Sequence, residues 1–297
     1  MTAITDRPTP LGVTEPGPAP RRRPFRALTV VQRTLAYVLI TMLALFCLVP
    51  FLWVLLSAFD SAAGPNVQVP TLSLANFAAF FADSGTPLLL WNSLVIGVGA
   101  TALNLILGLA GGYALARFEF PGRRLFMFGI LLIRVVPAPA TIVALYLLLV
   151  NLKLTNTLWG LILVEAVLQL PVTLWLLKGT ISAVPIELEE AAWVDGTSRF
   201  QAIWRIVLPL AGPGLGAAAM LTFMGVWGDF LTPLVMLQSQ ELYPLSIGLF
   251  RAFSENHQVD WGLLAATSIV YVLPPAVLYV FVRKNLLRSS LGGAVKG

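Results

Sequence analysis

The fold class is decided by an uncharged stretch near the N-terminus, TLAYVLITMLALFCLVPFLWVLLSAF, residues 34–59. Its 26 residues exceed the roughly 20 that a helix needs to cross the hydrocarbon core of a bilayer. Arginines precede it, as they precede a cleavable secretion signal, but the apolar part of such a signal has only about 7–15 residues. We therefore expect a retained transmembrane helix.

The composition of the whole chain also indicates a membrane protein. Charged residues make up 11% of the 297 positions and hydrophobic residues 58%, whereas soluble domains are about a quarter charged and less than half apolar. Further apolar stretches approach the length of a tilted transmembrane helix, at residues 90–116, 125–150, 158–177, 211–237 and 261–282. The sequence predicts an all-α, polytopic membrane protein with about six transmembrane helices.

The distribution of Lys and Arg predicts the orientation of the chain. If both termini are cytoplasmic, the cytoplasmic segments carry 16 of the 19 basic residues, in the N-terminal tail, at 117–124, at 178–205 and from Arg283 onward. Short loops rich in Lys and Arg stay on the cytoplasmic side, so we expect a cytoplasmic N-terminus and C-terminus. These charges flank several spans instead of forming one basic face, so the net charge of +5 does not indicate a nucleic-acid partner.

Four regions are expected along the chain. Residues 1–26 contain six prolines and too few apolar residues to fold alone. The expected regions are a disordered cytoplasmic tail at 1–33, the first transmembrane helix and an external segment at 34–89, a transmembrane domain at 90–283 that includes a cytoplasmic loop at 179–209, and a cytoplasmic C-terminal tail at 284–297. The only cysteine, Cys47, and the only histidine, His257, leave no disulfide, metal site or catalytic constellation to expect.

Prolines interrupt four of the six predicted spans, at Pro137 and Pro139, Pro171, Pro233, and Pro274 and Pro275. Each proline disturbs backbone hydrogen bonds, and lipid cannot satisfy the freed groups. This pattern favours a bundle that lines a cavity over a simple membrane anchor. No internal repeat is detectable, which weakens the case for a secondary transporter without excluding it.

The loop between the fourth and fifth spans is the most informative stretch for function, VPIELEEAAWVDGTSRFQAIWRIVLPL, residues 184–210. Its pattern predicts two short helices joined at Gly196, a position that requires positive φ. Ser198 and Gln201 form a capping-box signature for the second helix, which we expect to stop at Pro209. The second helix would present one apolar face, formed by Phe200, Ile203, Trp204 and Val207.

On the first of these helices, small residues lie where a partner could approach closely. Leu188, Ala191, Ala192 and Asp195 share one helical face. Its first turn is acidic, which suits a helix N-terminus. A compact helix with a small-residue face, presented to the cytoplasm, is typical of a docking element.

This loop resembles the EAA loop of ABC-importer permeases, in the residues Glu190-Ala-Ala-Trp-Val-Asp-Gly196 and the following Ile206-Val-Leu-Pro209. Three further segments resemble the carbohydrate-uptake, maltose-type class of these permeases, namely residues 114–122, 227–231 and 292–297. The resemblance implies the type I importer permease fold. It also implies that an ATPase subunit is contacted by residues of this loop and of the terminal tail. These residues are Glu190, Ala191, Ala192, Asp195, Gly196, Pro209 and Lys296.

The same resemblance implies the partners of the chain. A second homologous permease would complete the pathway, two separate ATPase subunits would use ATP and Mg²⁺, and an extracytoplasmic solute-binding protein would deliver a sugar. The expected location is the plasma (inner) membrane of a prokaryote, in contact with lipid. The sequence has no phosphate-binding loop of the P-loop kind, so this chain is expected to bind no cofactor and to be no enzyme.

Ionisable residues inside the predicted spans need partners, because an unpaired charge in a bilayer is costly. Arg134 and Glu165 lie at depths of roughly 14 and 18 Å if each residue adds about 1.5 Å, so we expect a structural ion pair, with Gln169 as a competing acceptor. Asp229, flanked by Trp227 and Phe230, is a candidate sugar contact, although the family often has Trp-Asn-Glu-Phe there. The alternative function is an ion-coupled secondary transporter, for which Glu165 and Asp229 would be the coupling carboxylates.

Overall fold

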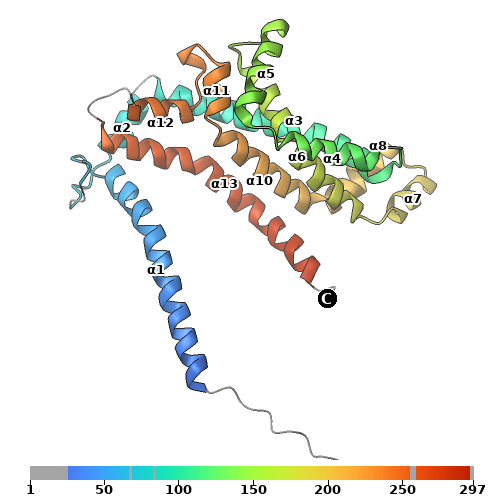
Figure 1. Cartoon of the computed structure of the whole chain (residues 1–297), viewed down its shortest axis with the longest axis horizontal. Coiled ribbons are helices and arrows are strands. Elements are labelled where there is room, and N and C mark those ends of the chain that lie inside the picture. The colour runs from blue at the N-terminus through green and yellow to red at the C-terminus, as the bar shows by residue number, and fades with distance from the viewer. Residues whose placement is uncertain (1–25, 67–68, 83–84, 255–258, 295–297) are drawn as a thin grey trace, which may run out of the picture. The chain divides into compact units, whose positions relative to one another are not determined.

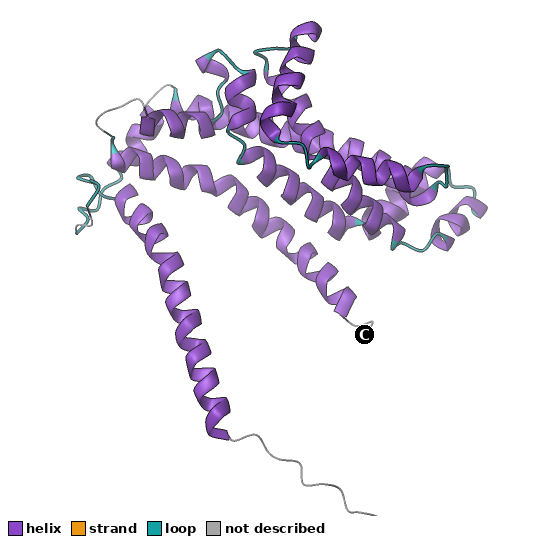
Figure 2. Cartoon of the chain, in the orientation of Figure 1, coloured by secondary structure: helices purple, strands orange, loops and turns teal. Residues whose placement is uncertain are grey.

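The computed structural model describes residues 26–66, 69–82, 85–254 and 259–294. Within this part of the chain the secondary structure is helical, with no strand (Figure 2). The chain separates into two compact units, residues 1–51 and 52–297.

The first unit contains most of helix α1, Arg26–Ala58. This helix begins at Arg26, eight residues before the predicted span at 34, because each residue added to an existing helix gains a hydrogen bond at little cost. The predicted tail of 1–33 is therefore helical from Arg26 onward, and its remainder lies outside the described residues. Residues 32–58 of this helix are long and apolar enough to cross a membrane.

Long helices form the body of the second unit (Figure 1), namely α3 (Thr86–Arg117), α6 (Leu158–Ser182), α10 (Gly212–Trp227) and α13 (Trp261–Ala294). Helix α3 packs along α6, and α10 packs against α3, α6 and α13. Shorter helices connect or flank them, namely α2 (Ala75–Ala82), α4 (Arg123–Ile133), α5 (Ala138–Leu152), α7 (Glu187–Val194), α8 (Arg199–Ala202), the π-helical turn η1 (Ile203–Val207), α9 (Leu208–Leu210), α11 (Leu231–Met236), the 3₁₀ turn η2 (Gln240–Leu242) and α12 (Leu245–Ser254).

Four described helices are long and apolar enough to cross a membrane, or five if the bent pair 199–210 and 212–227 counts as one span. The span predicted at 125–150 is wrong as a single helix. Helix α4 ends at Ile133 and α5 begins at Ala138, because Pro137 takes up an extended conformation between them. The span predicted at 211–237 is likewise interrupted, between Trp227 and Leu231.

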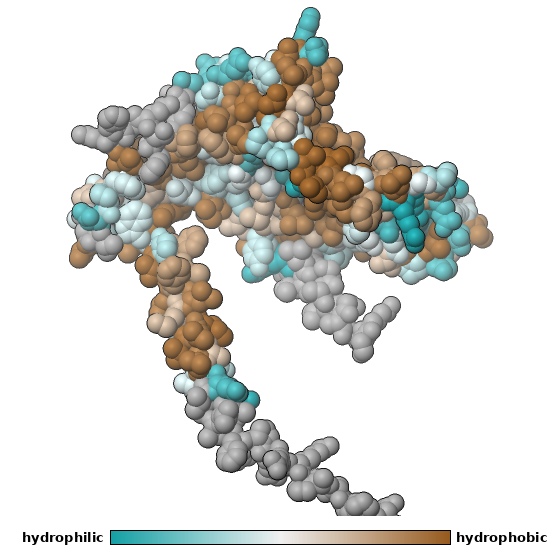
Figure 3. Space-filling view, viewed as in Figure 1, coloured by the Kyte–Doolittle hydropathy of each residue, from teal (hydrophilic) through white to brown (hydrophobic). Residues whose placement is uncertain are grey.

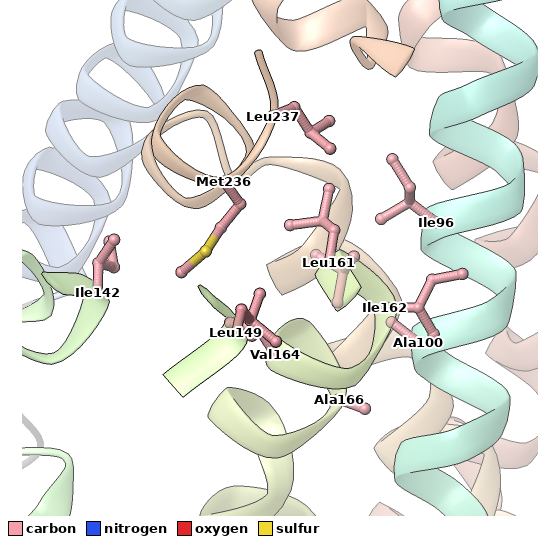
Figure 4. Packing of buried hydrophobic residues seen from close by; sticks show 11 residues of the cluster. Ile96, Ala100, Ile142, Leu149, Leu161, Ile162, Val164, Ala166, Met236 and Leu237 are labelled. Atoms are coloured by element: carbon pink, nitrogen blue, oxygen red, sulfur yellow. The ribbon is translucent and has the colours of Figure 1, made fainter. Parts of the chain in front are cut away.

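The core of the bundle is apolar and lies between α3, α6 and the segment around α11. Figure 4 shows Ile96 and Ala100 of α3 beside Leu161 and Ile162 of α6, with Met236 and Leu237 nearby. Small residues allow close approach of the two long helices, as is common in membranes. A Cβ added to Gly108 would lie 2.4 Å from the Thr173 Cγ2 atom.

A buried polar network ties three helices together at the level of this core. Asn104 of α3 donates a hydrogen bond of 2.7 Å to the Ala166 carbonyl of α6. The Thr222 hydroxyl of α10 donates to the Asn104 side-chain oxygen at 3.1 Å, and it lies 3.1 Å from the Thr173 hydroxyl. Because their donors and acceptors are used, these polar groups can be buried at little cost.

Loops that the charge distribution assigns to one side of the membrane contact one another. Asn156 accepts hydrogen bonds from the backbone N–H groups of Gln238 and Ser239. At the opposite end of the bundle, Arg117 donates to the Val184 carbonyl. Figure 3 shows hydrophilic residues gathered at the end that carries α7 and α8, and apolar residues over much of the bundle surface.

Candidate functional site

The loop from Val184 to Leu210 forms two short helices, as the sequence predicts. Helix α7 has an acidic first turn, which favours the N-terminal end of a helix. Gly196 has φ of +83°. The Thr197 N–H donates a hydrogen bond of 2.9 Å to the Ala192 carbonyl. This hydrogen bond is the helix termination that a residue with positive φ permits. A Cβ at Gly196 would meet no atom within 4 Å, so the preference for glycine here comes from the backbone conformation alone.

The second helix begins with the predicted capping box. The Gln201 N–H donates to the Ser198 hydroxyl at 3.3 Å, and the Ser198 N–H donates to the Gln201 side-chain oxygen at 3.1 Å. The chain remains helical to Leu210, one residue past the predicted stop at Pro209, and then bends by 78° before α10. The wider π-helical turn η1 precedes Pro209 and gives the proline ring room within the helix.

The π-helical turn also divides the apolar face predicted for this helix. Ile203 and Val207 point into the bundle and pack with Tyr113 and Leu177. Phe200 and Trp204 remain largely exposed, at 69% and 57%, and their rings are 6.0 Å apart. Exposed apolar side chains also occur on α7. We call the exposed apolar residues of the loop, Leu188, Val194, Phe200 and Trp204, the loop surface.

Most of the predicted ATPase-contact residues are accessible at this loop. The exposed ones are Glu190, Ala191, Asp195, Gly196 and Pro209, whereas Ala192 is half-buried. Lys296 lies outside the described residues. The loop therefore leaves five of these six loop residues exposed.

One strong polar contact of the loop was not predicted. Glu189 is the buried residue of α7, and its carboxylate is 2.6 Å from the guanidinium of Arg117. The Tyr113 hydroxyl donates to the other carboxylate oxygen at 2.8 Å. The sequence does contain a signal for this site, because Tyr113 and Arg117 are spaced to share one face of α3, but it does not identify which of the three glutamates faces them.

The predicted ion pair between Arg134 and Glu165 is not formed. Arg134 is exposed and donates a hydrogen bond of 2.7 Å to the Gln169 side-chain oxygen, the competing acceptor. The break between α4 and α5 explains the error, since Arg134 caps the end of α4 and is not in the middle of a continuous span.

Glu165 is instead buried beside a small cavity. One of its carboxylate oxygens has no hydrogen-bond partner in the described structure. The cavity has a water-accessible volume of about 10 Å³, close to the space needed by one water molecule. Asp229, Trp227 and Ser93 also line it.

The three predicted pathway residues have different environments. Trp227 is buried and stacks on Phe223 and Tyr271. The Asp229 carboxylate accepts hydrogen bonds from the N–H groups of Leu231 and Thr232 at 2.8 and 3.1 Å, so it caps the start of α11. The Phe230 ring lies 4.7 Å from that of Phe250. The described residues contain no group of three or more His, Cys, Asp or Glu side chains placed to hold a metal ion.

Comparison with known proteins identifies the family of this chain. The family model described as "Binding-protein-dependent transport system inner membrane component" matches residues 104–289, which include the loop. The chain is 32% identical over 267 residues to the diacetylchitobiose uptake system permease protein NgcG of Streptomyces coelicolor, with 88% of each chain covered. It is 31% identical over 273 residues to the maltodextrin transport system permease protein MdxG of Bacillus subtilis, covering 90% of this chain and 98% of that one.

A solved structure has the same fold. The chain superposes with a TM-score of 0.76 and 22% identity on a subunit of a bacterial ABC transporter involved in the import of the acidic polysaccharide alginate, covering 89% of this chain and 100% of that one. The resemblance seen in the loop sequence thus extends over the fold. The chain belongs to the family of inner-membrane components of binding-protein-dependent transport systems, and it is a permease subunit of an ABC importer.

Proposed function

We propose that this chain, with a second homologous permease, forms the membrane pathway for a sugar that an extracytoplasmic binding protein delivers. Two ATPase subunits, separate chains that bind ATP and Mg²⁺, drive the cycle. The proposal assigns Glu190, Ala191, Ala192, Asp195, Gly196 and Pro209 to the ATPase interface. The N-terminus and C-terminus are cytoplasmic.

The loop surface is the observation that carries this proposal. A cytoplasmic loop that kept its apolar side chains exposed without a partner would favour aggregation. Leu188 and Val194 lie on the accessible, acidic, small-residue helix α7 and Phe200 lies on α8, and exposed apolar side chains on a short helix suit a groove in a partner protein.

A sugar is the substrate class best supported. The relatives are uptake permeases for diacetylchitobiose and maltodextrin. Asp229 and the aromatic Phe230 lie near the break between α10 and α11, where carboxylate and ring suit the hydroxyls and apolar faces of a sugar. We assign this break to the substrate pathway.

Co-purification tests the docking assignment. Val194→Asp and Phe200→Asp each place a charge on the loop surface without disturbing the core, since both side chains are largely exposed. A charge in an apolar, desolvated contact is strongly unfavourable. We expect each variant to insert in the membrane in normal amount but to retain much less ATPase subunit than the wild type.

Phe120→Asp is the matched control, because Phe120 is also exposed but lies in the other cytoplasmic loop. It should retain ATPase at the wild-type amount. Equal loss of ATPase in the control, or normal binding by both loop variants, would contradict the assignment of the docking surface to residues 184–210.

A further inference from the structure

Helix α7 is tied to the cytoplasmic end of α3 by a buried carboxylate. The Arg117 Nε atom donates to Glu189 Oε1 at 2.7 Å, and the Tyr113 hydroxyl donates to Glu189 Oε2 at 2.8 Å. Glu189 is fully buried, and the Arg117 side chain is only 8% exposed. Both carboxylate oxygens of this α7 residue are therefore occupied by donors from one face of α3.

This contact resists separation of the two helices. Breaking a buried ion pair leaves an uncompensated charge, which costs more than the pair contributes. Arg117 also donates to the Val184 carbonyl at 2.9 Å, so the chain just before α7 is held as well. A displacement of α7 is therefore expected to carry the end of α3 with it.

The opposite end of α3 holds the loop between α11 and α12. Asn92, which is buried, donates to the Glu241 and Tyr243 carbonyls at 2.7 and 3.1 Å. The Leu245 N–H donates to the Ser93 hydroxyl at 2.8 Å. The charge distribution places this loop outside the cell. It thus faces the side on which a binding protein would deliver substrate.

One continuous helix connects these two contacts. Helix α3 runs from Thr86 to Arg117 without a break, and its 32 residues correspond to about 48 Å at 1.5 Å per residue. We propose that α3 is a coupling rod, with Tyr113 and Arg117 joining it to α7, Asn92 joining it to the loop between α11 and α12, and Ser93 joining it to the first residue of α12. These are positioning residues: they transmit the position of one loop to the other. The proposal rests on the proposed function, since it requires an ATPase at α7.

The test measures ATP hydrolysis by the reconstituted complete transporter, with and without its substrate-loaded binding protein. Glu189→Gln removes the charge at one end of α3, Tyr113→Phe removes a single hydroxyl there, and Asn92→Leu removes the two hydrogen bonds that Asn92 donates at the other end. We expect stimulation by the binding protein to fall by about fivefold or more in Glu189→Gln and Asn92→Leu, the lower end of usual allosteric couplings. Tyr113→Phe should give a smaller fall. The basal rate and the amount of bound ATPase should stay near wild type.

The double variant distinguishes coupling through α3 from two independent structural effects of the substitutions. If both contacts act through α3, Asn92→Leu combined with Glu189→Gln should reduce stimulation no further than the stronger single variant. Glu187→Gln is the control, because Glu187 is exposed on the same helix and should keep full stimulation. Wild-type stimulation in both Glu189→Gln and Tyr113→Phe, multiplied losses in the double variant, or a loss that only follows the amount of assembled complex would overturn the proposal. Failure of the wild-type permease to bind an ATPase at all would instead contradict the proposed function.

Discussion

The Arg134 guanidinium donates a hydrogen bond of 2.7 Å to the Gln169 side chain and forms no ion pair with Glu165. Hydrogen bonds between helices in membranes contribute about 0.6 kcal/mol on average and about 1.7 at most. A double-mutant cycle of Arg134→Leu and Gln169→Leu should therefore give a coupling free energy of this size in thermal unfolding in detergent. The cycle of Arg134→Leu with Glu165→Leu should give a value near zero. A larger coupling with Glu165 than with Gln169 would contradict the structure.

Gly196 tests whether the orientation of the two loop helices matters for transport. An L-residue in its left-handed conformation costs about 1–2 kcal/mol, a factor of roughly 5–30 in population. Gly196→Val should reduce uptake by about this factor while the protein inserts normally. Gly196→Asn, whose side chain tolerates positive φ, should keep most of the uptake. If both variants transport equally, the positive φ of Gly196 is not required.

A substitution at Gly160 tests whether the tight turn at the start of α6 contributes to stability. A Cβ there would lie 2.2 Å from the Leu154 backbone carbonyl oxygen, and backbone cannot yield as a side chain can. We expect Gly160→Ala to cost about 1–3 kcal/mol, or roughly 2–4 °C of Tm for each kcal/mol. Gly129→Ala is the control, since its Cβ would meet nothing within 4 Å, and its Tm should not fall. Equal Tm values for the two variants would show that the turn relaxes freely.

Asp229 combines a capping role with a proposed substrate contact, and two substitutions separate them. Asp229→Ala removes the acceptor of the Leu231 and Thr232 N–H groups and should cost about 0.5–2 kcal/mol of stability. Asp229→Asn keeps an acceptor oxygen but removes the charge, so it should retain most of the stability. If Asp229 contacts the sugar, Asp229→Asn should raise the KM for uptake. An unchanged KM in a stable Asp229→Asn variant would remove Asp229 from the pathway.

Local rules were sufficient to predict the helices and caps of the loop. Positive φ at Gly196 and the capping box of Ser198 and Gln201 are both confirmed, because each depends on residues only a few positions apart. The π-helical turn η1 before Pro209 was not predictable in this way. Its residues Ile203 and Val207 pack against other helices, and those contacts join residues far apart in the sequence.

Contacts between distant segments set the limit of prediction for the site. Counting residues along two uninterrupted spans predicts that Arg134 lies near Glu165. The break at Pro137 ends α4 at Ile133, so that count does not apply. Glu189 was indistinguishable in the sequence from its exposed neighbours Glu187 and Glu190. Only the contacts of Tyr113 and Arg117 with its carboxylate distinguish Glu189 as the buried one.

The most direct test of the account is uptake into proteoliposomes that contain this permease, its partner permease and the ATPase subunits. The substrate-loaded binding protein is added outside, and the radiolabelled sugar that it binds is followed. We predict that accumulation requires Mg²⁺ and ATP inside the vesicles and persists when ionophores abolish every ion gradient. Accumulation that needs an ion gradient and proceeds without ATP would contradict the importer function proposed for this chain.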